Sequence, residues 1–165
     1  MAIITPEERE FVERCGLFHV LAGQQRISGL IVGWLLISKP PHQSITELAD
    51  ALDISKASAS TVVRRLQQAR IVERHPVPGS RQHYYRITGG GNWIEITRAR
   101  MELIRLGREL GEHGVSLFGD DPQRQERISE YADFLAFMEE QFGDEVLARW
   151  EAFRRKRIKE REASR

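Results

Sequence analysis

The stretch that decides the fold runs from Ser44 to Arg86 and reads SITELADALDISKASASTVVRRLQQARIVERHPVPGSRQHYYR. It opens with a capping-box pattern, because Glu47 follows Ser44 by three residues and each side chain can bind a backbone amide that the other leaves free. Apolar residues then recur at helical spacing, and the period breaks at Asp53. This pattern predicts a first short helix that ends in a tight turn.

A second short helix follows the turn, with Ser55 as its cap. No acidic residue occurs between Lys56 and Arg70, although a solvated helix face normally mixes acids with bases to gain pairs four residues apart. The residues expected on the outer face of this helix are Lys56, Ser58, Ser60, Thr61, Arg64, Arg65 and Gln68. Short hydroxyl side chains and arginines can bind base edges and phosphates of DNA.

A basic hairpin completes the stretch. Residues 71–74 and 83–87 are rich in β-branched and aromatic residues, and the intervening turn contains proline and glycine. Arg81 lies near the tip, where it could enter a minor groove or hold a phosphate. From residue 55 to residue 90, seven basic residues and one acid, Glu73, give a formal charge of +6. The helix pair and hairpin predict a winged helix-turn-helix that binds double-stranded DNA, and the alternative is an ordinary solvated surface.

Three segments carry a resemblance to a known family: GLIVGWLLISKPPHQSITELADALDISKASAS, LQQARIVERHPVPGSRQHYYR and RISEYADFLAFMEEQFGDEVLARW. With them the chain resembles the MarR superfamily of transcriptional regulators, and more narrowly its GbsR-type branch, from about Cys15 to Trp150. The resemblance implies a homodimer held by its terminal helices, regulation of osmoprotectant genes and a choline-like small-molecule effector. Many MarR proteins carry an aspartate two residues before the wing arginine, and Gly79 stands in that place here.

The remaining chain predicts a mainly α fold with a small β-hairpin wing, in which a winged helix-turn-helix is joined to a helical dimerisation region. We expect an N-terminal dimerisation helix over residues 1–23, the DNA-binding domain over 24–91, and a helical dimerisation region over 92–165 whose basic C-terminal tail frays. Gly29 and Gly33 share one helix face and predict close approach of another helix. A helix is expected from about Trp93 to Gly111, followed by a loop over residues 111–121.

Composition places further limits on the protein. The 165 residues carry a net charge of only +1, so the distribution of charge is more informative than its total. Twelve basic and fifteen acidic residues from position 101 onward give −3 for that region. The single cysteine excludes an intramolecular disulfide, and the longest apolar run, residues 27–37, is too short to span a bilayer. The N-terminus does not resemble a signal peptide, so we expect a cytoplasmic protein without a membrane anchor.

The candidate DNA-binding residues are Ser44, Lys56, Ser58, Ser60, Thr61, Arg64, Arg65, Arg81 and Gln82. Trp34, Trp93 and Trp150 could enclose a quaternary ammonium ligand by cation–π attraction, but packing between helices is the favoured interpretation. Cys15 could be a thiol sensor, although its place on an apolar stripe favours a core role. The chain has no HExxH, CxxC, P-loop or GxSxG motif, and its five histidines lack metal-ligand spacing, so neither catalysis, a metal nor a cofactor is predicted.

These patterns together predict a transcription factor, interpreted as a ligand-responsive homodimeric repressor. A two-fold dimer places two recognition helices about one DNA turn (~34 Å) apart and therefore reads a pseudo-palindromic operator. The alternative is a winged-helix module that binds another protein and has no specific operator, because a fold alone does not fix function. The acid-free helix face favours DNA.

Overall fold

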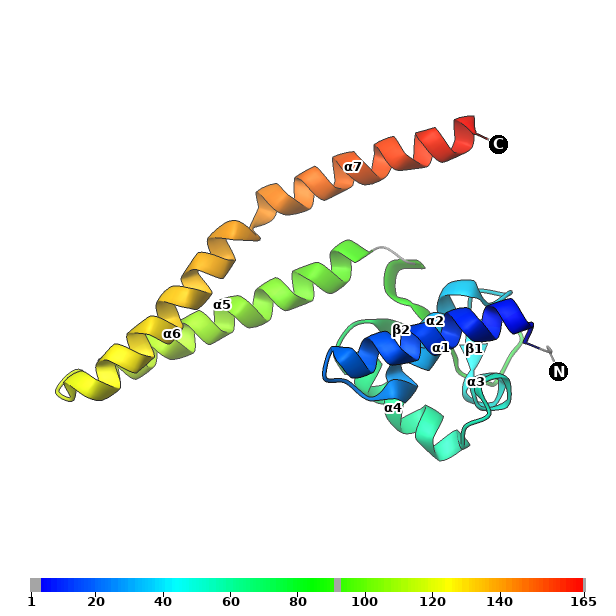
Figure 1. Ribbon diagram of the computed structural model, residues 1–165, viewed down its shortest axis with the longest axis horizontal. Coiled ribbons are helices and arrows are strands. Elements are labelled where there is room, and N and C mark those ends of the chain that lie inside the picture. The colour runs from blue at the N-terminus through cyan, green and yellow to red at the C-terminus, as the bar shows by residue number, and fades with distance from the viewer. Residues whose placement is uncertain (1–3, 91–92, 165) are drawn as a thin grey trace. The chain divides into compact units, whose positions relative to one another are not determined.

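The computed structural model describes residues 4–90 and 93–164 and divides into two compact units, residues 1–96 and 97–165 (Figure 1). The first unit contains α1 (Pro6–Leu21), α2 (Arg26–Ile37), β1 (Gln43–Ser44), α3 (Ile45–Leu52), α4 (Lys56–Gln68), β2 (Val72–His75), β3 (Tyr84–Ile87) and the 3₁₀ turn η1 (Thr88–Gly90). Helix α5 (Trp93–Leu117) continues into the second unit, which also holds α6 (Pro122–Gln141) and α7 (Asp144–Ala163). The mainly α fold with a small antiparallel sheet is confirmed, whereas Gly91, the expected end of the DNA-binding domain, lies outside the described residues.

Two helices begin at the capping boxes that their sequences predict. At α1 the Thr5 hydroxyl accepts a hydrogen bond from the Glu8 amide at 3.2 Å, and the Glu8 carboxylate accepts one from the Thr5 amide at 2.9 Å. At α3 the corresponding distances between Ser44 and Glu47 are 3.2 and 2.6 Å. Each box binds backbone amides that a helix start would otherwise leave free.

Helices α1 and α2 approach one another through glycine. A Cβ atom built on Gly29 would lie 2.2 Å from the carbonyl oxygen of Cys15, and one built on Gly33 would lie 2.8 Å from the Cys15 Cβ. Such distances exclude any side chain at Gly29, so the predicted close approach is confirmed and α1 is the helix that makes it. Cys15 is partly buried at this contact, and burial raises the pKa of its thiol.

The core of the first unit joins α2, the helix-turn-helix and the sheet. Its largest fully buried side chains are Ile31, Leu48, Val63 and Val72, one from each of α2, α3, α4 and β2. The sheet has the order β1-β3-β2, and all its pairs are antiparallel. Strand β1 has only two residues and was not predicted from the sequence, because it is defined by pairing with Tyr84 and Tyr85 far along the chain.

In the second unit α5 and α6 lie side by side as an antiparallel pair (Figure 1). The predicted loop over residues 111–121 is wrong in its first part, because α5 continues to Leu117. The glycines read as turn signals serve helix contact instead. A Cβ on Gly111 would lie 2.8 Å from the Cβ of Ala132, and one on Gly114 would lie 3.0 Å from Ile128. The Arg108 guanidinium also binds the Glu139 carboxylate of α6 at 2.7 Å.

The basic C-terminal segment is helical rather than frayed, since α7 extends to Ala163. Ion pairs along the helix account for this order: Arg157 binds Glu160 at 2.9 Å, and Lys156 lies 3.9 Å from the same carboxylate. Pairs three or four residues apart stabilise an exposed helix. Across the part of the chain that the structure describes, no helix is both long and apolar enough to cross a bilayer.

Candidate nucleic-acid interface

Helix α4 is positioned by its cap and its buried face. The Ser55 hydroxyl accepts a hydrogen bond from the Ser58 amide at 3.0 Å and donates one to the Ser58 hydroxyl at 2.8 Å. The buried residues of the helix are Ala59, Val62, Val63 and Leu66. These residues fix the rotation of α4, so its remaining side chains form one outer face.

The outer face of α4 presents cations without neutralising partners. Lys56, Thr61, Arg64 and Arg65 are exposed, and Ser58 and Ser60 are partly exposed. Within the described residues, no carboxylate forms an ion pair with Lys56, Arg64 or Arg65. Their charge is therefore available to an anionic partner, and the helix N-terminus adds a partial positive charge beside the hydroxyl groups.

A groove of about 560 Å³ lies between the start of α2 and this face of α4. Ser58, Thr61 and Arg65 line it from α4, and Gln25 and Arg26 line it from α2. Arg26 also pairs with Glu13 on α1, whereas the Gln25 side chain makes no capping bond to α2. The sequence analysis did not select Gln25, since only the packing of α2 against α4 brings it to the interface.

The wing carries the two other predicted DNA-binding residues. Arg81 and Gln82 are exposed in the turn between β2 and β3, where Gly79 has a φ of +80° that favours glycine. The Glu73 carboxylate binds Arg86 across the two strands at 2.7 Å. The only acid of the hairpin is therefore already paired with a cation other than Arg81.

Ser44 does not belong to this exposed surface. Only 3% of its surface is exposed, and its hydroxyl accepts the hydrogen bond from the Glu47 amide. The prediction that Ser44 contacts DNA is therefore corrected to a capping role, because a buried hydroxyl engaged at the start of α3 cannot reach a duplex.

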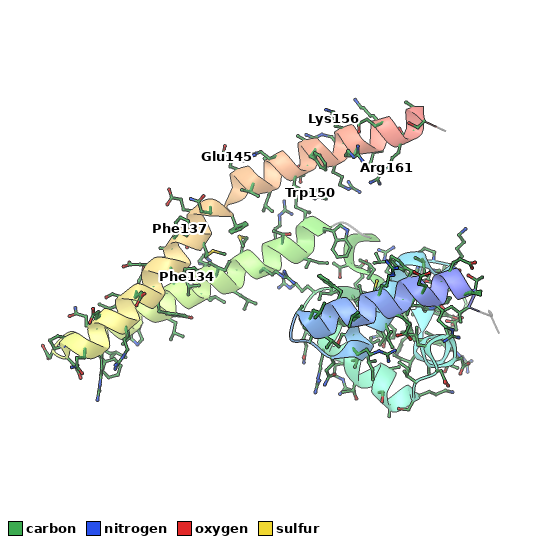
Figure 2. All side chains as sticks on the ribbon, viewed as in Figure 1. Phe134, Phe137, Glu145, Trp150, Lys156 and Arg161 are labelled. Atoms are coloured by element: carbon green, nitrogen blue, oxygen red, sulfur yellow. The ribbon has the colours of Figure 1, made fainter. Side chains whose placement is uncertain are left out.

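The three tryptophans have different environments. Trp34 exposes 4% of its surface in the core, and its indole nitrogen donates a hydrogen bond to the Gln43 side chain at 3.4 Å. Trp93 begins α5 and is 41% exposed, whereas Trp150 lies in α7, where its ring is 5.9 Å from that of Phe153 (Figure 2). The burial of Trp34 favours the packing interpretation over a ligand cage for that residue.

A cluster of aromatic rings joins the base of the wing to β1. The His42 ring lies 4.6 Å from that of His75 and 5.4 Å from that of Tyr84. Burial lowers the pKa of His75, and the positive charge of Arg86 and the neighbouring His42 lower it further, whereas Glu73 opposes them. Elsewhere among the described residues, no group of three histidine, cysteine or acidic side chains is arranged to hold a metal ion.

Comparison with known proteins identifies the family. A family model described as MarR family matches residues 25–83, and one described as an MmpR5-like MarR family transcriptional regulator matches residues 91–155. The HTH-type transcriptional regulator MmpR5 of Mycobacterium tuberculosis is 36% identical over 140 residues, which cover 84% of each chain. A crystal structure of a transcriptional regulator has 34% identity and a TM-score of 0.80, and the match covers 89% of this chain and 99% of that one.

The two family models together span the helix-turn-helix, most of the wing and the helices of the second unit. Neither model is described as GbsR-type, so that narrower assignment stays a prediction. The relative's identity and coverage, together with the winged-helix fold, decide the broader assignment. The chain belongs to the MarR family of winged-helix transcriptional regulators.

Proposed function

We propose that this protein is a homodimeric repressor that reads a pseudo-palindromic DNA operator with α4 and the wing. The observation that carries the proposal is the outer face of α4, where Arg64 and Arg65 are exposed and have no acidic partner among the described residues. Arginine can bind guanine edges or phosphates, and the small hydroxyl side chains of Ser60 and Thr61 allow the helix backbone to approach a major groove.

A dimer is supported by apolar side chains that the second unit leaves exposed. Leu103 on α5 is 68% exposed, Leu110 on α5 is 65% exposed, and Phe134 on α6 is 59% exposed (Figure 2). Contiguous apolar surface of this kind is typical of a protein interface. A second copy that covers it would present two α4 helices to successive turns of one duplex, about 34 Å apart.

Repression follows if the dimer occupies a promoter. A small-molecule effector that binds more tightly to one arrangement of the two α4 helices would change DNA affinity without contacting DNA, by shifting the population of the two arrangements. The effector belongs to the proposal only in this general form, because the buried Trp34 offers little surface to the choline-like ligand that the sequence suggested.

The test is a fluorescence-anisotropy titration of the dimer with the DNA upstream of its own gene. We expect a dissociation constant of about 10 to 100 nM that weakens steeply with salt, and much weaker binding to a scrambled duplex. Equal and weak binding to both duplexes at both of two salt concentrations would contradict operator recognition and favour the protein-interaction alternative.

Arg64→Ala combined with Arg81→Ala should lower operator affinity by about 100-fold, because each side chain is expected to lose a charge-assisted hydrogen bond. A matched control combines Arg105→Ala with Arg155→Ala, which removes the same number of charges from residues that pair with Glu102 and Glu151. The control should retain operator binding. Circular dichroism and light scattering check that both variants stay folded and keep the same oligomeric state.

A further inference from the structure

The wing contains a hollow of about 410 Å³ between the end of β2 and the turn that leads to β3. We call it the wing hollow and define it by the residues that line it and carry polar groups: Arg74, His75, Ser80, Arg81, Gln82 and His83. The turn around it is locally ordered, since the Ser80 amide donates to the Val77 carbonyl at 3.2 Å and the Gln82 amide donates to the Ser80 hydroxyl at 3.1 Å.

The alternation of strand β2 separates the acid of the wing from the wing hollow. Successive side chains of a strand point to opposite faces, so Glu73 and Arg74 face different ways. The Glu73 carboxylate binds Arg86, its partner across the two strands, at 2.7 Å. As far as the structure describes the chain, no carboxylate lines the wing hollow, so the charges of Arg74 and Arg81 are not neutralised there.

Side chains in the wing hollow are mainly hydrogen-bond donors. The Arg74 guanidinium donates to the Nδ1 atom of His83, and this contact fixes the position of the guanidinium. The Ser80 hydroxyl accepts from the Gln82 amide, so its own proton is free to be donated. Two guanidinium groups and a hydroxyl suit a ligand that carries negative charge and only accepts hydrogen bonds, which is the chemistry of a phosphate group.

We infer that the wing hollow binds one phosphate of the DNA backbone, with Arg74 and Arg81 as its two cationic donors. The inference rests on the proposed function for the identity of the duplex. It assigns Arg81 to a phosphate rather than to the minor groove and adds Arg74, which the sequence analysis did not select. His83 is a positioning residue, because it acts on the ligand through Arg74.

The first experiment asks whether the wing hollow binds phosphate at all. The full-length protein, labelled with ¹⁵N, is titrated with inorganic phosphate and, separately, with sodium chloride at matched ionic strength. We expect the arginine Nε–H signals of Arg74 and Arg81 to shift and saturate with phosphate only, and the Arg81 shift to shrink in Arg74→Ala. Equal shifts with both salts would overturn the inference.

The second experiment asks whether the ligand is a phosphate of the DNA backbone. Operator duplexes that carry a neutral methylphosphonate at one position each are titrated with the wild type and with Arg74→Ala. On the unmodified duplex, Arg74→Ala should weaken binding about tenfold and lower the salt slope by about one. At one backbone position the methylphosphonate should remove the effect of Arg74→Ala, because the two changes delete the same contact.

Arg70→Asn is the matched control for the second experiment. Arg70 is exposed in the same unit, does not line the wing hollow, and has a φ of +54° that asparagine tolerates. Its effect should add to that of every methylphosphonate. Arg74→Lys is a second variant, which should keep the salt slope while losing the bidentate geometry and part of the affinity.

The two experiments separate the possible failures. Saturable phosphate binding without coupling at any methylphosphonate position would overturn the DNA assignment and leave a site for a free anion. If the promoter and a scrambled duplex bind equally, the proposed function fails, whereas the phosphate titration still decides whether the wing hollow is a phosphate site.

Discussion

The two units of this protein use their charged and apolar side chains in opposite ways. In the first unit, large apolar side chains such as Ile31 and Val63 are fully buried, while Arg64 on the outer face of α4 has no acidic partner among the described residues. In the second unit, Arg105 forms ion pairs with acids of its own helix, while Leu103 is 68% exposed.

This difference indicates which kind of partner each unit can gain from. A cation that already pairs with a carboxylate gains little from a phosphate, whereas an unpaired cation gains a new charge-assisted bond. An exposed leucine gains free energy when an apolar surface covers it. The first unit is therefore suited to an anionic partner and the second to an apolar one, in agreement with the proposed DNA-binding dimer.

The largest expected effect tests whether the first unit depends on its tight helix packing. Gly29→Ala places a Cβ at 2.2 Å from the Cys15 carbonyl oxygen, and a backbone atom cannot yield as a flexible side chain can. We expect unfolding of the first unit to become easier by about 3 kcal/mol or more. Chemical denaturation followed by far-UV circular dichroism measures it.

Gly119→Ala is the control for this prediction, because its Cβ would meet only the Val115 carbonyl oxygen at 3.6 Å, an ordinary contact. A stability within about 0.5 kcal/mol of the wild type is expected there. If Gly29→Ala were equally neutral, the close approach of α1 and α2 would not be a constraint on the first unit.

A smaller effect tests whether the exposed leucines of the second unit hold a dimer. Leu103→Ser removes an apolar side chain that lies away from the contact between α5 and α6, so the helix pair should remain intact. Losing its burial at an interface should weaken dimerisation by about 1.5 kcal/mol, or about tenfold. Sedimentation equilibrium measures the change, and an unaltered dimer would place the interface elsewhere.

A still smaller effect tests the ion pairs of the second unit. Glu139→Gln removes the charge that binds Arg108 between α6 and α5, and both side chains are partly exposed. The free energy of unfolding should fall by about 0.5 kcal/mol at fixed protein concentration, as measured in urea. Glu151→Gln, whose partner Arg155 lies 3.9 Å away on an exposed helix, should change nothing measurable.

The smallest expected effect concerns pH and the first unit. Burial lowers the pKa of His19 and of His75, so the unfolded chain takes up protons more readily than the folded one. Their contribution to stability is therefore fully present above the ordinary pKa of about 6.5 and is lost as pH falls through the lowered values. Denaturation at pH 7.5, 6.5 and 5.5 measures this slope, and His75→Phe should flatten it. A gain in stability on acidification would contradict the assignment.

Local interactions were predictable from the sequence. The capping boxes at Thr5 and Ser44 involve partners three residues away, so their spacing is visible in the chain. Gly29 and Gly33 likewise predict a helix contact, although the sequence does not identify Cys15 as the partner.

Contacts between distant residues were not predictable in the same way. Gly111 was read as part of a loop, because a glycine is a turn signal unless a second helix, here at Ala132, requires it. Ser44 was expected at the DNA surface because its burial depends on pairing with Tyr84, forty residues further on. Arg74 escaped notice because its charge becomes available only when strand alternation directs Glu73 to Arg86.

Ser44 also gives the wing a mechanical connection to the helix-turn-helix. Its backbone is paired with Tyr84 in the sheet, while its side chain holds the first turn of α3, and α3 packs against α4 in the common core. A force on the wing is therefore transmitted through a single residue to the start of α3 and on to α4. The wing and α4 act as one stiff lever, so the curvature of a duplex and the fit of α4 in its groove are set together.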